Sequence, residues 1–278
     1  MKTTSGILVT VLSAAWLMAG CDKKPAASSW SLDQSEASTQ LKQFITAQEV
    51  QARKLAKQDG MNLPSDFDLF CKAAQTGDWQ TATNLFGRMS KRIQDDSSVH
   101  GSWWSATMDA YGVFEMFPPG DKYATAFGSD IIQSIPDGSI YFGGTDPGRF
   151  IVTAMSESHA DGKPFFTFTQ NALADGTYLD YLRSMYGGKL YIPTAEDSQK
   201  CFQDYTEDVA RRQQSNQLKP GENVTIKDGR IQVSGQVAVM EINGLLVKTI
   251  FERILAMNFT LKKAFRSTGC IRTSNRTA

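Results

Sequence analysis

Apolar residues between positions 38 and 118 recur every three or four residues, which is the spacing that lines one face of an α-helix. The pattern predicts a first helix that ends near Gly60. It predicts a second helix that opens with a capping box of Ser65 and Asp68, and a third that Asp78 caps. We therefore expect this part of the chain to be helical throughout.

The second and third of these helices, FDLFCKAAQTGDWQTATNLFGRM, resemble a single tetratricopeptide-type hairpin. No second copy follows at a fixed spacing, so a repeat array is not supported. An aromatic helical segment comes next, and we favour core packing for its rings over a platform that stacks sugars. These rings belong to Trp103, Trp104, Tyr111, Phe114 and Phe117.

From position 119 to 253, short apolar runs alternate with helical patterns. Runs at residues 139–142, 164–169 and 189–192 are typical of strands, and a hairpin follows that turns at Asp228 and Gly229. A final apolar helix is predicted from Val237 to Phe251. Strands separated by helices favour parallel pairing. The predicted fold class is α/β: an N-terminal helical segment followed by a mostly parallel, βαβ-built sheet with flanking helices.

Composition narrows the class of protein. The 278 residues hold 29 basic and 29 acidic side chains and are 41% hydrophobic, which is typical of a globular protein. No run of Lys and Arg is interleaved with aromatic residues, so we expect no nucleic-acid partner. The two histidines, His100 and His159, stand outside any Cys/His cluster with metal-ligand spacing, so we expect no metal site and no cofactor.

Residues 1–20 have the layout of a secretion signal, with Lys2 before an apolar stretch too short to span a bilayer comfortably. The segment closes with LMAGC, which resembles a bacterial lipobox, so Cys21 is predicted to receive diacylglycerol on its sulfur. An ordinary signal with a chance cysteine is the alternative. The prediction is a lipoprotein held at the lipid bilayer on the periplasmic face of the cell envelope, with residues 21–37 as a polar tether. Inner and outer membrane both remain open.

Residues 254–278 differ sharply from the rest: they hold five basic residues, no acidic one and no sustained apolar period. With one choice of codons, restoring a single base before the Ile254 codon yields NPGHEFYIEESFPLDWMYPHLEPHG, which has a strand pattern, acids and turn-forming prolines. We interpret the tail as frameshifted and non-native. We therefore expect no functional role for Lys262, Lys263 and Cys270. A natural basic tail that binds anionic lipid is the alternative.

The turn within SIYFGGTDPGRF is the one motif suited to hold a ligand. Its glycines allow close backbone approach, and the start of the following helix together with a guanidinium favours an anion. The candidate residues are Gly143, Gly144, Thr145, Asp146, Gly148 and Arg149. Asp146 would repel a phosphate unless it bound a cation or a sugar hydroxyl. The alternative is a tight, capped turn whose Arg149 pairs with a nearby carboxylate.

Other candidates are weaker, and catalytic residues stay unknown. Asp180 is placed on a helix near the expected ligand edge, but an exposed structural carboxylate is the favoured interpretation. No GxSxG motif is present, so an activated serine is not indicated. Cys71 and Cys201 permit a disulfide in an oxidising compartment, and two unpaired thiols fit equally well.

The runs GSIYFGGTDPGRF, PFFTFTQNALADGTYLDYLRSMYGGKLYIP and QVAVMEINGLLVKTIF together resemble a known family. They are similar to the soluble C-terminal region of bacterial membrane proteins described as protein O-mannosyltransferase-like, of the GT-C type. The resemblance covers roughly residues 120–253 and implies an accessory α/β module. The membrane-helix bundle that carries catalysis in that family has no counterpart after the signal, so glycosyl transfer is not implied.

The first functional hypothesis is a membrane-tethered, extracytoplasmic binding or assembly module, not an enzyme, with a membrane glycosyltransferase as a candidate partner. The second is an enzyme or binding protein for a sugar or a phosphorylated substrate at the Gly143–Arg149 turn. A helical scaffold is disfavoured by the single hairpin.

Overall fold

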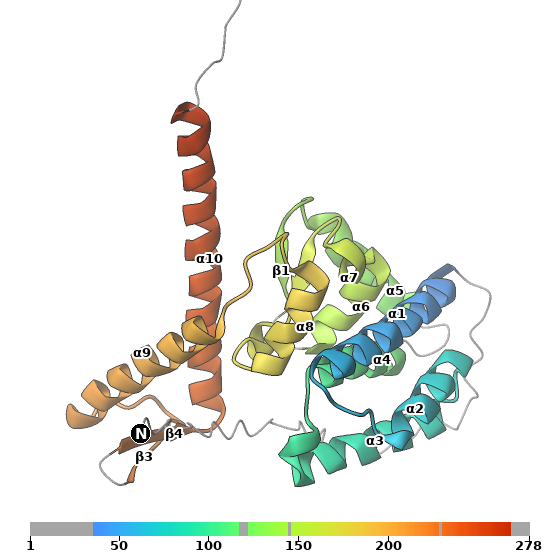
Figure 1. Ribbon diagram of the computed structural model, residues 1–278, viewed down its shortest axis with the longest axis horizontal. Coiled ribbons are helices and arrows are strands. Elements are labelled where there is room, and N and C mark those ends of the chain that lie inside the picture. The colour runs from blue at the N-terminus through green and yellow to red at the C-terminus, as the bar shows by residue number, and fades with distance from the viewer. Residues whose placement is uncertain (1–35, 117–121, 144–145, 228–229, 268–278) are drawn as a thin grey trace, which may run out of the picture.

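The computed structural model describes residues 36–116, 122–143, 146–227 and 230–267 (Figure 1). Its first part is helical, as the sequence predicts. The elements are α1 (Glu36–Gln58), α2 (Ser65–Thr76), α3 (Trp79–Asp95), the 3-10 turn η1 (Ser97–Val99), α4 (Trp103–Met116) and α5 (Lys122–Ser134). The signal, Cys21 and the tether up to residue 35 lie outside the described residues, and residues 36 and 37 of the predicted tether belong to α1.

Local capping of α2 and α3 follows the sequence only in part. The Asp78 carboxylate accepts the Thr81 amide at 3.1 Å, which confirms the predicted cap of α3. The capping box of Ser65 and Asp68 is wrong, because α2 already includes Ser65 and is preceded by Pro64, which supplies no side-chain cap. A proline fits there, since its fixed φ and missing N–H suit a helix entry.

The core runs through the helical body. It is built from apolar faces of α1, α2, α3, α4, α6 and α8, and the aromatic segment contributes Trp103 and Trp104, 1% and 8% exposed. Tyr111 stacks on Phe86 with ring centroids 3.9 Å apart. Core packing is therefore confirmed for these rings, while the Phe114 side chain and Phe117 lie outside the described part.

The second part of the chain mixes helices with short strands. The elements are β1 (Ile140–Phe142), α6 (Asp146–Ser156), α7 (Ser158–Asp161), β2 (Phe166–Phe168), η2 (Gln170–Ala172), α8 (Gly176–Tyr186), α9 (Ala195–Gln214), β3 (Asn223–Lys227), β4 (Arg230–Ser234) and α10 (Gln236–Ser267). β1 and β2 pair in parallel through the α6–α7 crossover, which is one βαβ unit. β3 and β4 form the predicted antiparallel hairpin.

The strand predicted at residues 189–192 is absent, so the sheet has fewer parallel strands than expected. The amides of Lys189 and Leu190 both bond to the Tyr186 carbonyl, which closes a turn after α8 instead of a ladder. The described residues are 70% helical and form an α/β mix with no large parallel-sheet core.

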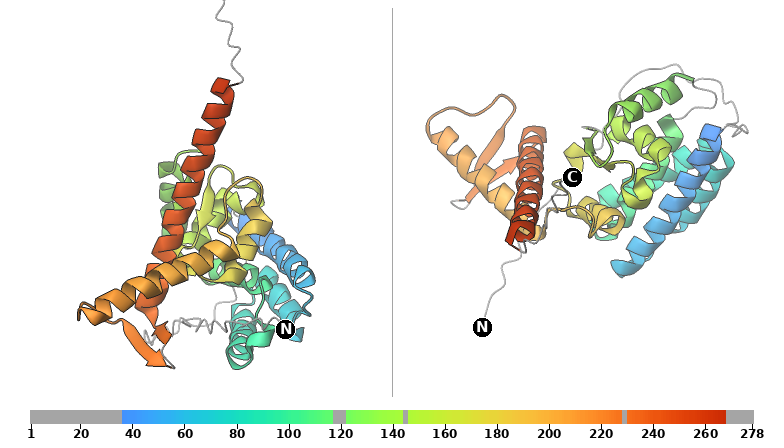
Figure 2. Two further views of the ribbon diagram at one scale, coloured as in Figure 1. Left: turned by 60° about the vertical axis from the view of Figure 1, so that its left-hand side comes forward. Right: turned by 90° about the horizontal axis from the view of Figure 1, so that it is seen from above.

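α9, β3, β4 and α10 form a unit beside the helical body (Figures 1 and 2). A small apolar cluster of Tyr205, Val209 and Ala238 holds it together. The buried Asn243 of α10 ties this unit to the body: its amide donates to the Asn171 carbonyl at 2.9 Å and accepts the Ala174 amide at 2.6 Å. α10 continues past residue 253 as a helix, across the compositional break.

Candidate functional site

The predicted strand–turn–helix exists at Gly143–Arg149. The Gly143 amide donates to the Phe168 carbonyl at 2.8 Å and so continues the pairing of β1 with β2. A Cβ at Gly143 would lie 2.7 Å from the Cβ of Arg149, so only glycine fits where α6 passes the strand end. Gly144 and Thr145 lie outside the described residues, as do the side-chain surroundings of Asp146 and Gly148.

The Arg149 side chain lies inside the protein and not at the surface of the turn. Its side chain is 1% exposed, and the guanidinium forms a two-pronged ion pair with the Asp109 carboxylate of α4, with Nη1 to Oδ2 at 2.8 Å and Nη2 to Oδ1. Its Nε donates to the Thr169 hydroxyl. An anion could reach this guanidinium only by displacing Asp109. The structure thus has the arrangement that the alternative interpretation of the turn expects, in which Arg149 pairs with a carboxylate inside the protein.

The ion pair belongs to a buried polar network that joins four helices and a strand end. The Tyr181 hydroxyl of α8 lies 2.6 Å from Asp109 Oδ2 and 2.9 Å from the Gln48 amide oxygen of α1. The Thr169 amide donates to the Tyr178 hydroxyl at 2.7 Å. Buried charges persist only when paired and hydrogen-bonded, and this network meets that condition.

The electrostatics of the network do not suit proton transfer near neutral pH. Burial raises the pKa of Tyr181 well above its usual value, and the Asp109 charge raises it further. Burial likewise raises the pKa of Tyr178 to about 12. Burial alone would lower the pKa of Arg149, but the adjacent Asp109 carboxylate outweighs it and the pKa lies well above the usual range. The tyrosines stay neutral and the arginine stays charged, so the arrangement is suited to holding helices together.

Sequence reasoning missed Asp109 and Gln48, although a signal exists. Asp109 is the one acid within the apolar run WWSATMDAYGVF, and a charge on a core-facing helix position calls for a buried partner. The sequence could not identify that partner, because Asp109 and Arg149 lie 40 positions apart.

The weaker candidates are mostly structural. Asp180 is about half exposed and pairs with Arg183, three residues along α8. Asp175 caps α8 by accepting the Thr177 amide at 2.8 Å. Cys71 and Cys201 are free and buried, so no disulfide joins them. Burial raises the pKa of the Cys71 thiol to about 12, which leaves it unreactive at neutral pH.

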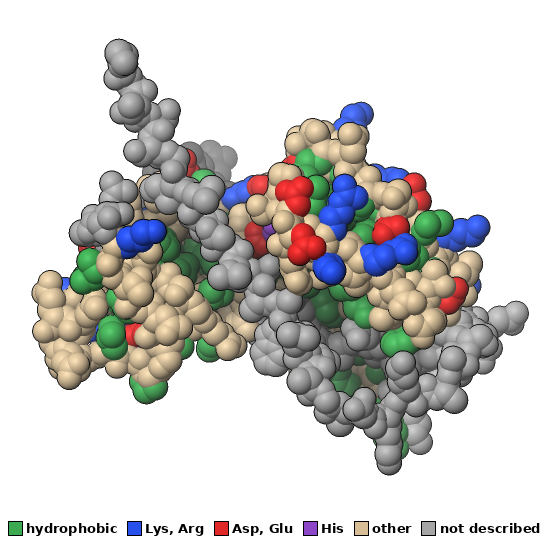
Figure 3. All heavy atoms as spheres, turned by 90° about the horizontal axis from the view of Figure 1, so that it is seen from below, with side chains coloured by type: hydrophobic (Ala, Val, Ile, Leu, Met, Phe, Trp, Pro, Cys, Tyr) green, Lys and Arg blue, Asp and Glu red, His purple; other side chains and the backbone are tan. Residues whose placement is uncertain are grey.

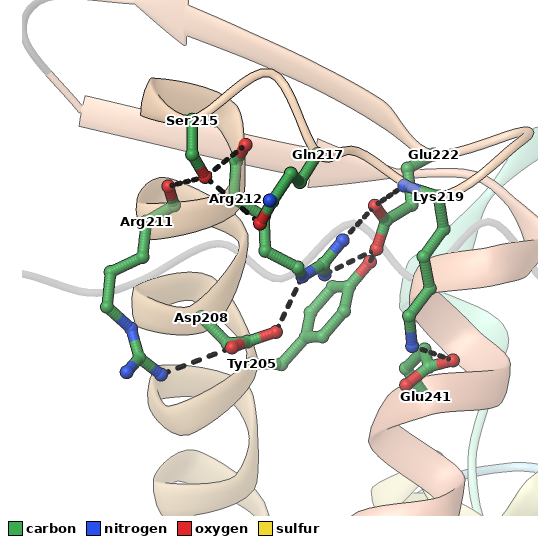
Figure 4. Close-up of polar contacts among 9 residues, drawn as sticks. All are labelled: Tyr205, Asp208, Arg211, Arg212, Ser215, Gln217, Lys219, Glu222 and Glu241. Carbon is green, nitrogen blue, oxygen red and sulfur yellow. Dashed lines mark hydrogen bonds and ion pairs between the residues drawn. The ribbon is translucent and has the colours of Figure 1, made fainter.

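A second polar cluster fastens the hairpin to α9 (Figure 4). The Glu222 carboxylate accepts Arg212 Nη2 at 2.7 Å, the Tyr205 hydroxyl at 3.0 Å and the Lys219 amide at 2.6 Å. These bonds, led by the one from Arg212, lower the pKa of Glu222 to about 2. Lys219 in turn pairs with Glu241 of α10 at 2.7 Å, so the cluster connects α9, the hairpin and α10.

The hollows on the described surface include two that border the helices of interest. One, of about 190 Å³, lies between the start of α2, the end of α3 and Trp103 of α4. The other, of about 300 Å³, runs between α9 and α10 along Asp204, Asp208 and Met240. In Figure 3 acidic and basic side chains are interspersed over the helical body, so this face presents no field of one sign.

Comparison with known families, with characterised proteins and with solved structures finds no match to this chain. None of the helices within the described ranges combines the length and apolar composition that a membrane crossing needs. The same residues contain no group of three or more His, Cys, Asp or Glu side chains placed to hold a metal ion.

Proposed function

We propose that the protein is a lipid-anchored module of the bacterial cell envelope that binds or assembles with a partner and is not an enzyme. The observation that carries the proposal is the LMAGC segment ending at Cys21, followed by a polar tether. An acylated cysteine holds a domain at the bilayer, since each buried methylene contributes about 0.8 kcal/mol.

The contacts of the ionisable residues support the part of the proposal that the protein is not an enzyme. Arg149, the strongest candidate for ligand contact, lies inside the protein against Asp109. Asp180 pairs with Arg183, and both described thiols are buried. Arg149 and the two thiols therefore belong to the interior and Asp180 forms a surface ion pair, which is the pattern of a binding domain more than that of an enzyme.

The face proposed for the partner lies on α10. Met240 and Phe251 are 53% and 49% exposed, and their spacing along the helix, with the bare Gly244 between them, puts them on one stripe. Exposed apolar stripes of this kind mark protein–protein contacts. The family resemblance supplies the partner: a membrane glycosyltransferase at the same bilayer surface.

The proposal also includes a larger parallel sheet than the described residues form. We infer that the α6 crossover unit is the start of a mostly parallel sheet, which the restored reading frame after Arg253 would extend. Its EFYIEE stretch has the alternation of a strand, and β1 with β2 supplies a short parallel pair to extend. Resequencing the gene tests this: a missing base near the Arg253 codon is expected, and an intact frame overturns it.

Lipid anchoring is tested by Cys21→Ser, with Cys270→Ser as the matched control. Cys21→Ser should abolish palmitate labelling and move the protein from the membrane to the soluble fraction. Cys270→Ser should leave both unchanged. Labelling that persists in Cys21→Ser contradicts the anchor.

The docking face is tested by a photo-crosslinking residue placed at Met240 or Phe251, with Lys72 on α2 as an exposed control position. We expect adducts with a membrane glycosyltransferase from the α10 positions only. Equal adducts from Lys72, or none from α10, would contradict the assignment of this face.

A further inference from the structure

The cavity between α2, α3 and α4 has walls of two chemical kinds. Leu63, Ile93, Val99 and Trp103 form an apolar wall, and Ile93 and Trp103 are themselves 8% and 1% exposed, so this wall is part of the core. Arg92 contributes the only charge among the lining residues, which include no acid. The cavity therefore combines an apolar interior with a net positive rim.

Arg92 has no protein partner among the described residues. No ion pair or hydrogen bond there involves its guanidinium, whereas Arg88, one turn earlier on α3, binds Asp66 with two bonds of 3.0 and 2.9 Å. Asp96 is near enough for the Arg92 charge to lower its pKa slightly, as the last of several causes. The Asp96 carboxylate is instead occupied by the amide and hydroxyl of Ser98.

A hydrogen-bond donor without an acceptor also belongs to one of the lining residues. The indole N–H of Trp103 is buried and has no hydrogen-bond partner, which is costly for a core side chain. α2 begins beside the cavity behind Pro64 with no side-chain cap, and the Phe67 amide bonds to the Pro64 carbonyl at 2.9 Å. The guanidinium and the orphaned indole N–H both favour an anion.

We propose that this cavity binds a small carboxylic acid as its anion, with the carboxylate on Arg92 and a ring-sized apolar body against Leu63, Ile93 and Trp103. The volume of about 190 Å³ sets the size of that body. A cavity of roughly 150 Å³ accommodates benzene, so the difference leaves room for a carboxylate. This site lies on the helical body and does not depend on the lipid anchor or on the α10 face.

Calorimetric titration of the purified full chain in a carboxylate-free buffer tests the proposal, with benzoate as the probe. Benzamide has the same shape without the charge, and acetate has the charge without the ring. We expect benzoate to bind with a Kd on the order of 0.1–1 mM, and both controls to bind at least about tenfold more weakly, a difference of about 1.4 kcal/mol. Equal affinity for benzoate and benzamide, or no heat with benzoate, overturns it.

Variants then assign the charge to Arg92. Arg92→Ala should weaken benzoate at least about tenfold, and Arg92→Lys should restore part of the loss because a lysine lacks the planar fork. Lys91→Ala is the matched control, since it removes the same charge from the neighbouring position of α3, outside the cavity. Circular dichroism confirms that each variant is folded. If Lys91→Ala weakens binding as much as Arg92→Ala, the effect is a general one of charge and the site is refuted.

A spectroscopic readout places the ligand independently of affinity. Benzoate should shift the indole Nε1–H resonance of Trp103, identified by its loss in Trp103→Phe. Filling the cavity mouth with Ser65→Trp should suppress both the shift and the heat. A shift that persists in Ser65→Trp would locate the ligand elsewhere and contradict the proposal.

Discussion

Replacing Asp109 with alanine is expected to destabilise the helical body by about 3–5 kcal/mol, because it leaves the Arg149 guanidinium buried without a counter-charge. The two side chains are each 1% exposed, so water cannot take the place of the carboxylate without opening the core. The Tyr181 hydroxyl loses its contact at 2.6 Å but keeps Gln48 at 2.9 Å, so it adds little to the cost. The total free energy of unfolding of a typical domain is about 5–15 kcal/mol, so this loss would be a large fraction of it.

The double replacement of Asp109→Leu with Arg149→Met separates the net contribution of the ion pair to stability from the cost of leaving one of its charges unpaired. Removing both charges abolishes their desolvation as well as their attraction, and such replacements are often neutral or stabilising. We therefore expect the double variant to lose less than half of what Asp109→Ala loses. Asp180→Ala removes an exposed acid of α8 that pairs with Arg183, and should change stability by less than about 0.5 kcal/mol.

Urea denaturation followed by intrinsic fluorescence measures these differences, since Trp103 and Trp104 lie on α4 near Asp109. A shift of the midpoint at constant slope reports stability alone. The reasoning is refuted if Asp109→Ala lowers the free energy of unfolding by less than about 1 kcal/mol, or if the double variant lowers it as much as Asp109→Ala does.

Three further outcomes are expected. Gly143→Ala should destabilise by about 1–3 kcal/mol, measured by the urea midpoint, because its Cβ would lie 2.7 Å from that of Arg149; an unchanged midpoint contradicts the close approach. The folded pKa of Glu222 is about 2 against roughly 4.3 unfolded, so its stabilisation is present above the unfolded value and is lost as pH falls from about 5 to 2. Glu222→Gln should remove that pH dependence and lower the free energy of unfolding by about 1 kcal/mol at pH 7. If the stability of the two proteins changed with pH in parallel, the expectation would be contradicted. Asp78→Ala should cost about 1 kcal/mol through the lost cap of α3, seen as a lower melting temperature, and no change would mean that water replaces the carboxylate.

Helices could be predicted because their signals are local. The periodic apolar face of α1 and the Asp78 cap of α3 both depend on residues within one or two turns of each other. The hairpin of β3 and β4 was also predicted, since its strands are adjacent in sequence. The exception is α2, where a proline entry replaced the side-chain cap that the sequence pattern favoured.

Long-range structure could not be predicted in the same way. A short apolar run such as residues 189–192 fits a strand or a buried loop equally well, and only the turn bonded to the Tyr186 carbonyl decides between them. The candidate turn could be recognised from its glycines, but the burial and pairing of the Arg149 side chain depend on an acid 40 positions away. The Arg92 cavity carries no sequence motif, because its walls come from three separate helices.

Asn243 and two apolar residues fasten α10 to the helical body. The Asn243 amide bonds to Asn171 and Ala174, and the buried Leu246 and Ile250 hold the next two turns of the helix against the core. Asn243 therefore supplies the polar part of a contact that sets the direction of α10, and its replacement by leucine would remove that part while leaving the helix's own hydrogen bonds intact.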